Sequence, residues 1–222
     1  MRAAEVFYDS YAEARGFTRG ESGQVDGLTQ LLRKGDRQKF DQMFSGRLSP
    51  DFEGTLAHFT YTVETTDSDG YPDTRDSRFT VVLIEVPEAA DYVPDLIVRP
   101  RYQEGAIYRA LGGETDNREE DSEPRDYEEV TLESQALVDR YRIAVRRDQD
   151  ANWLRQLFSP TFIFWLTDVE PEDFSFEVSG GHLCAFVEGH VESAEEFDGL
   201  ISAGCTFGRR LRDEATEGAG TS

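Results

Sequence analysis

Apolar residues recur every three or four positions at the start of the chain, which is the spacing of an amphipathic helix. We predict a helix over residues 3–15 that ends before Gly16. Residues 17–50 are polar and rich in glycine, with short apolar groups near Leu31 and near Phe40. There we predict one or two short helical turns between loops.

The pattern changes at Phe52, after which apolar and polar residues alternate as they do along a half-buried strand. Residues 57–64 predict one such strand. Residues 79–86 are apolar on both faces, which predicts a strand in the interior of a sheet. The polar residues 66–73 predict the hairpin loop between these strands, and residues 96–98 predict a further short strand.

The second half of the chain carries clear signals for both helices and strands. Ser193 and Glu196 have the spacing of a capping box at the start of a helix, and Gly180-Gly181 supplies a two-residue hairpin turn. The predicted elements are a strand at 141–145, helices at 153–158 and 160–166, hairpin strands at 174–179 and 182–187, and a final helix from Ser193 to Asp213.

The order of these elements predicts an α+β fold, with a mostly antiparallel sheet, flanking helices and a helix at each terminus. We expect one domain over residues 1–214 and a disordered tail at residues 215–222. Residues 113–129 form the most acidic stretch of the chain and contain almost nothing apolar, which predicts a loop. Whether this acidic loop divides the domain into two subdomains is left open.

The charge of the chain limits its partners. It has 45 Asp and Glu against 23 Lys and Arg, and the formal net charge is −22. Such a charge repels nucleic acid and anionic membranes, so we expect no direct nucleic-acid binding. The same charge can imitate the phosphate backbone toward a basic protein, which keeps nucleic-acid mimicry open as an alternative. No stretch is apolar enough for a membrane segment or a signal peptide, so we expect a cytoplasmic protein.

One set of residues has the chemistry of metal ligands. It consists of His182, Cys184, His190 and Cys205. His182 and Cys184 point to the same side of their predicted strand, and the donor types suit tetrahedral zinc. The spacing matches no paired-cysteine signature, so the alternative is a pair of buried free thiols with surface histidines. Apart from this zinc candidate, we expect no cofactor.

Signatures of catalysis and nucleotide binding are missing from the sequence. It contains no Gly-x-Ser-x-Gly elbow, no phosphate-binding loop and no dinucleotide fingerprint. Arg140, Arg142 and Arg146 share the exposed face of the strand predicted at 141–145. They either grip an anionic ligand or pair with neighbouring carboxylates. This pattern favours a non-enzymatic function, and we assign no catalytic residue.

Three short segments in the middle of the chain share a layout with a known family. They are Val130-Thr131-Leu132-Glu133-Ser134, Asp139-Arg140-Tyr141-Arg142-Ile143 and Leu157-Phe158-Ser159-Pro160. Over roughly residues 50–190, the chain resembles a domain of unknown function found mainly in actinobacterial proteins. Leu137-Val138 departs from the Phe-Asn expected there. The resemblance implies no activity and supplies no catalytic residues. Glu133 is interpreted as a structural ion-pair partner of Arg140 or Arg142 or as a cap, with a catalytic acid as the lesser alternative.

These observations favour a non-enzymatic, cytoplasmic protein-interaction domain with a protein partner. A first alternative is a small-molecule- or zinc-binding enzyme or sensor that uses the four residues named above. It predicts that replacement of Cys184 by serine removes bound metal. The second alternative, an acidic nucleic-acid mimic, predicts salt-sensitive competition with DNA for a basic protein.

Overall fold

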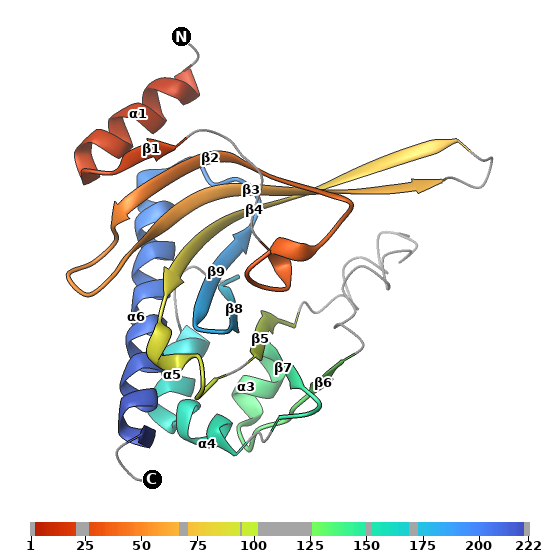
Figure 1. The fold of residues 1–222 in the computed structure, drawn as a ribbon, viewed down its shortest axis with the longest axis vertical. Coiled ribbons are helices and arrows are strands. Elements are labelled where there is room, and N and C mark those ends of the chain that lie inside the picture. Colours follow the sequence, from red (N-terminus) through yellow and green to blue (C-terminus); the bar gives the residue numbers. More distant parts are fainter. Residues whose placement is uncertain are drawn as a thin grey trace.

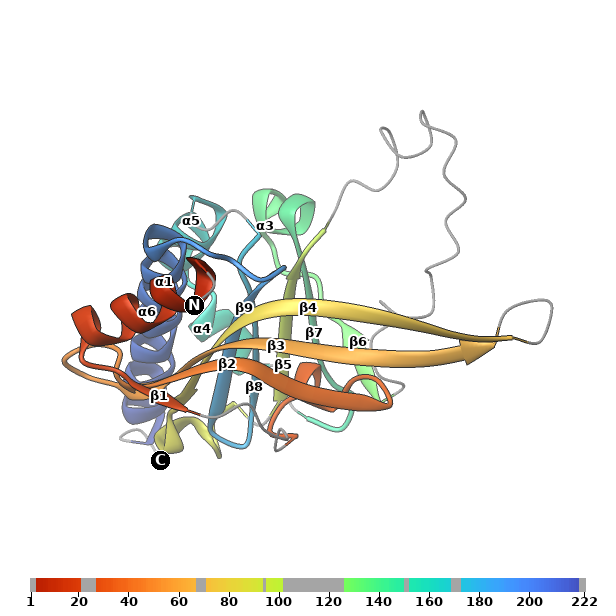
Figure 2. The ribbon, with the colours of Figure 1, turned by 90° about the horizontal axis from the view of Figure 1, so that it is seen from above.

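One antiparallel sheet of nine strands runs through the protein, and its helices lie mainly against one face (Figures 1 and 2). The structure, a computed structural model, describes residues 3–20, 27–66, 71–93, 95–101, 126–149, 152–168 and 173–219. The predicted α+β class, the antiparallel sheet and the helix near each end are confirmed.

The strands follow the spatial order β1-β2-β3-β4-β9-β8-β5-β7-β6. Their bounds are β1 Thr18–Gly20, β2 Arg37–Arg47, β3 Glu53–Thr66, β4 Pro72–Glu85, β5 Asp95–Pro100, β6 Tyr127–Glu129, β7 Tyr141–Arg146, β8 Ser175–Ser179 and β9 His182–Glu188. The helices are α1 Ala3–Arg15, α3 Gln135–Arg140, α4 Trp153–Leu157, α5 Pro160–Asp168 and α6 Ala194–Ala219, with short 3-10 turns η1 Leu31–Arg33 and η2 Pro87–Ala89. In Figure 2, the paired strands β3 and β4 extend well past the helices.

The segment predicted to hold short helical turns contains η1 but is mainly extended, because Phe40 and Phe44 lie in β2. A bulge between Phe40 and Gln42 inserts one residue into β2. As a result Phe40 and Met43 pack on one face of the sheet, while Phe44 packs on the other. A bulged strand therefore has the three- and four-residue spacing that otherwise indicates a helix.

The middle of the sheet is buried on both faces. The main core lies between the sheet and the helices, and it includes Val82 and Ile84 of β4. A smaller core on the opposite face lies under η1 and includes Val81 of the same strand. Because β4 contributes to both cores and pairs with β3 and β9, its predicted interior position is confirmed.

Helix α6 runs the length of the helix layer and starts at the predicted capping box. The Ser193 hydroxyl accepts a hydrogen bond from the Glu196 backbone N–H at 3.2 Å and contacts the Glu196 carboxylate at 2.5 Å. The predicted end of ordered structure near residue 214 is too early, because α6 continues to Ala219 and buries Ala215 against the core. Residues 220–222 lie outside the described residues.

Strands from both sides of the predicted acidic loop interleave in the sheet. β4 pairs with β9, and β5 pairs with both β7 and β8. The end of the acidic stretch forms β6, whereas residues 113–125 lie outside the described residues. Among the described helices, none combines the length and the apolar character needed to cross a membrane.

Candidate functional site

The four predicted zinc ligands do not come together. Cys184 packs in the core under η1, whereas Cys205 packs in the core between the sheet and the helices. The sheet itself separates the two thiols, because β9 presents Cys184 to the face opposite α6. No group of three or more His, Cys, Asp or Glu within the described residues is arranged to hold a metal ion. Both cysteines are free thiols, and burial raises the pKa of each.

The arginines predicted near β7 are engaged by neighbouring groups. Arg146 contacts the carboxylates of Asp95 at 3.3 Å and Asp148 at 2.6 Å. Arg142 lies 3.6 Å from a carboxylate oxygen of Glu129, and Arg140 donates to the backbone oxygen of Thr167. The carboxylate-pairing interpretation therefore describes Arg142 and Arg146.

Glu133 is not the ion-pair partner of Arg140 or Arg142. It lies 4.0 Å from Arg155, and both side chains are well exposed. The neighbouring Ser134 caps α3, so the chain turns into a helix directly after Glu133 and carries its carboxylate away from the arginines of β7. An exposed pair of this kind contributes little to stability.

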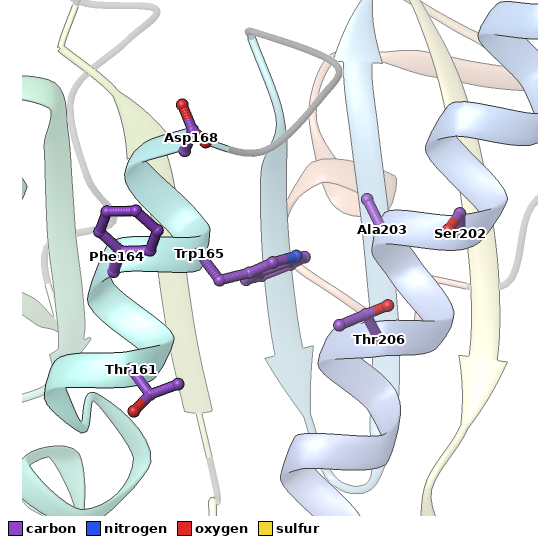
Figure 3. A pocket seen from close by; sticks show the side chains of 7 residues that line it. All are labelled: Thr161, Phe164, Trp165, Asp168, Ser202, Ala203 and Thr206. Atoms are coloured by element: carbon purple, nitrogen blue, oxygen red, sulfur yellow. The ribbon is translucent and has the colours of Figure 1, made fainter.

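A groove between α5 and α6 is the candidate binding site (Figure 3). It has a volume of about 370 Å³ and is open to solvent. Its lining consists of Thr161, Phe164, Trp165 and Asp168 from α5 and Ser202, Ala203 and Thr206 from α6. The side of the groove formed by α6 carries only small side chains, and Trp165 projects from α5 toward it.

Local sequence explains why α5 presents this face. Pro160 begins the helix, and the preceding Ser159 hydroxyl accepts from the Phe162 backbone N–H at 3.4 Å. Phe162 and Leu166, four residues apart, are buried in the core. Since one side of a helix turns inward, the intervening Phe164 is carried to the outside.

Aromatic packing joins the two helices beneath the groove. The ring of Phe162 stacks on Phe207 of α6 with centroids 5.5 Å apart. Trp165 packs on Phe162 at 5.2 Å and edge-on against Phe174 at 6.1 Å. These contacts give the groove a packed aromatic floor, so that its shape is formed before anything binds.

Phe164 stands at the rim of the groove and is the most exposed large apolar side chain of the described residues, at 72%. The sequence signal for it was present, because residues 162–166 form an uninterrupted apolar run. A two-turn helix cannot bury five consecutive apolar side chains on one face. That run therefore indicates a surplus apolar residue on the surface of the helix.

A second group of side chains combines His190 of the predicted zinc set with His58, which sequence analysis did not single out. His58 of β3 stacks on His190 with ring centroids 4.3 Å apart and an interplanar angle of 6°. Burial, reinforced by the neighbouring His190, lowers the pKa of His58 to about 4. Burial also lowers the pKa of His190. His58 escaped notice because it occupies a polar position in an alternating strand, which predicts a solvent face.

Asp41 of β2 lies beside this pair, with a carboxylate oxygen 3.9 Å from His190 Nε2. Burial alone would raise the pKa of Asp41, but hydrogen bonds from Lys39 and Thr60 hold it below its usual value. The distances from these donors are 2.8 Å for Lys39 and 2.6 Å for Thr60. The bulge in β2 places Asp41 here, since it is the extra residue between Phe40 and Gln42.

The comparisons with known proteins bear on the fold. No family model and no curated protein matches the chain. The fold is similar to the crystal structure of the mycobacterial trehalose monomycolate transport factor A, TtfA, with a TM-score of 0.55 and 12% sequence identity. The similarity covers 96% of this chain and 95% of that chain. The α+β architecture is therefore shared along nearly the whole length, and the resemblance to the actinobacterial domain stays a prediction.

Proposed function

We propose that this chain is a non-enzymatic protein-interaction domain of the cytoplasm, and that the groove between α5 and α6 seats a segment of the partner. The observation that carries the proposal is Phe164, which stands 72% exposed on the rim of a formed groove. Aromatic side chains, Phe among them, are enriched at protein–protein interfaces, where buried anchors carry much of the binding energy.

The negative charge of the groove and of the whole chain indicates which charge the partner segment carries. Asp168 is the one ionisable residue in the groove lining, and it is acidic. The chain as a whole carries a formal charge of −22, which attracts basic segments and repels acidic ones. The expected occupant is therefore a segment of another protein with a large apolar side chain flanked by Lys or Arg.

Shape supports the same occupant. The small side chains of Ser202, Ala203 and Thr206 leave room along α6, and Trp165 supplies a flat apolar surface opposite them. Close approach of a second backbone is easiest beside small residues, while an apolar anchor is best held against an aromatic floor. The structural neighbour, which shares the fold, is named a trehalose monomycolate transport factor, and a binding role for this chain is in keeping with that name.

The proposal is tested by selecting peptides from a random phage-displayed library on the full chain. The affinity of selected peptides is then measured for the wild type and for Thr206→Arg, which fills the groove and places a positive charge in it. Thr216→Arg is the matched control, because it makes the same change at an exposed position of the same helix outside the groove.

We expect selected peptides to combine a large apolar residue with basic residues. They should bind Thr206→Arg at least about tenfold more weakly than the wild type, which corresponds to the loss of one central contact. Binding to Thr216→Arg should match the wild type. Equal binding to all three proteins, or selection of acidic peptides, contradicts the proposal.

A further inference from the structure

The stacked pair of His58 and His190 joins three parts of the protein. His58 is 2% exposed, and the edge of the Tyr8 ring of α1 packs against it at 5.6 Å with an interplanar angle of 86°. Phe197 of α6 packs against it at 5.7 Å. His190 belongs to the connection between β9 and α6. The pair therefore lies where α1 meets both the sheet and this connection.

Each ring donates one hydrogen bond to a backbone carbonyl oxygen, while burial favours the neutral form of both rings. His58 Nε2 lies 2.9 Å from the backbone oxygen of Val191, so this nitrogen carries the proton and donates. His190 Nε2 lies 3.3 Å from the backbone oxygen of Phe59 and donates in the same way. Parallel rings 4.3 Å apart are compatible with two neutral groups, whereas two cations at that distance repel each other in a site with little water.

The charged and titratable groups that face the pair come from several elements. Asp41 and Lys39 face it from β2, Arg78 from β4 and Tyr8 from α1. Asp41 favours a proton on His190, while Lys39 and Arg78 oppose one. Because Asp41 also pairs with Lys39 at 2.8 Å, it cannot compensate fully for two charged imidazoles.

We propose that the stacked histidines form an acid-sensitive latch, in which protonation separates the rings and releases helix α1 from the sheet. Release begins at Tyr8, since the far end of α1 is held separately. There Tyr11 donates to Asp198 of α6 at 3.0 Å, and Arg15 pairs with the same carboxylate. Opening uncovers the rings of Phe44 and Phe197, on which Tyr8 and Tyr11 pack.

Linkage sets the size of the effect. A histidine that titrates at about 4 when latched and near 6.5 when released binds protons more strongly in the released state. Between pH 7.5 and pH 5.0, this difference raises the released population about thirtyfold for His58 alone. Once Tyr8 leaves the sheet, the first turns of this 13-residue helix are no longer packed, and a short unpacked helical segment is unstable in water. Its backbone amides then become open to exchange.

The test is hydrogen exchange of the full chain at pH 7.5 and pH 5.0, with rates corrected for the intrinsic effect of pH. The corrected exchange of α1 amides should rise about thirtyfold at the lower pH, while that of the β8–β9 hairpin should change less than about threefold. An unchanged rate in α1, or an equal rise in α1 and the hairpin, overturns the latch.

Two variants separate the latch from other effects of acid. His58→Gln keeps an N–H donor for the Val191 oxygen but cannot be protonated, so most of the rise in α1 exchange should vanish. Asp41→Asn removes the carboxylate that stabilises protonated His190 in the latched state, so the rise at pH 5.0 should be larger than in the wild type. A smaller rise in Asp41→Asn overturns the proposal even where His58→Gln does not fold.

Discussion

Replacement of Glu177 by glutamine tests the buried ion pair that holds η1 on the sheet. Glu177 lies on β8, an interior strand of the sheet, and its side chain is 1% exposed. One carboxylate oxygen accepts from Arg99 Nη2 at 2.6 Å, and the other accepts from the Leu31 backbone N–H at 2.6 Å. Glutamine keeps the size of the side chain but supplies one acceptor instead of two. Either Arg99 or Leu31 then faces an N–H donor.

The cost follows from the burial of the partners. Removing one member of a fully buried ion pair costs about 3–5 kcal/mol, because the other charge is left uncompensated. The Arg99 side chain is 18% exposed, so that water recovers part of the loss. We therefore expect Glu177→Gln to lower the free energy of unfolding by about 3 kcal/mol, near the low end of that range.

Urea unfolding at pH 7.5 measures this loss as a lower midpoint with an unchanged slope. Glu133→Gln is the matched control, because Glu133 is 91% exposed and lies 4.0 Å from Arg155. Its effect should stay below about 0.5 kcal/mol. Hydrogen exchange of the Leu31 amide should accelerate in Glu177→Gln before global unfolding. A loss below about 1 kcal/mol in Glu177→Gln refutes the role assigned to the ion pair.

Three further predictions concern pH, thiols and glycines. The pKa of His58 is lowered to about 4 in the folded protein, below its ordinary 6.5. Its contribution to the free energy of unfolding is therefore complete above pH 6.5, and about 3 kcal/mol of it is lost as the pH falls to 4. Urea midpoints across this pH range measure the loss. Burial raises the pKa of Cys184 and Cys205, so Ellman's reagent at pH 8 should label neither thiol until the chain unfolds. A Cβ on Gly54 would lie 2.3 Å from the Leu83 backbone oxygen, so Gly54→Ala should lower the free energy of unfolding by at least about 2 kcal/mol. Gly199 lies in open space on α6, so Gly199→Ala should raise the free energy of unfolding by up to about 1 kcal/mol. Thermal unfolding measures both changes.

Each of these expectations has a contradicting result. A urea midpoint that is constant between pH 6.5 and pH 4 would show that His58 titrates normally when folded. Rapid labelling of either thiol in the native state would place it at the surface. Equal effects of alanine at Gly54 and Gly199 would mean that β3 and β4 separate easily at Gly54.

Sequence patterns predicted the elements that bury one face or both, and they failed where the backbone is irregular or where a second layer covers a polar face. Residues 57–64 alternate, but alternation does not tell which face is covered. His58 and Thr60 are buried because α1 and the connection after β9 lie over them. The bulge in β2 gives the apolar residues of this strand a three- and four-residue spacing, so the sequence pattern predicted helical turns where the structure has a strand.

The candidate site was harder to predict because it depends on pairs of distant elements. The zinc set shared ligand chemistry, yet whether two residues meet depends on the sheet face that each element covers. Cys184 and Cys205 lie on opposite sides of the sheet, a relation that residue spacing does not contain. The groove forms only because α5 and α6 lie side by side, which the sequence does not show. The one sequence signal for an exposed apolar site was the surplus of apolar residues around Phe164.

The interleaved order of the strands has a consequence for synthesis of the chain. β4 occupies the middle of the sheet, but one of its two partners, β9, is translated about a hundred residues later. Until residues 182–188 have left the ribosome, the growing chain carries β4 with one unpaired edge next to Val81 and Val82. Such an edge can pair with other chains. Productive folding in the cell therefore requires that this edge be shielded until β9 has been translated.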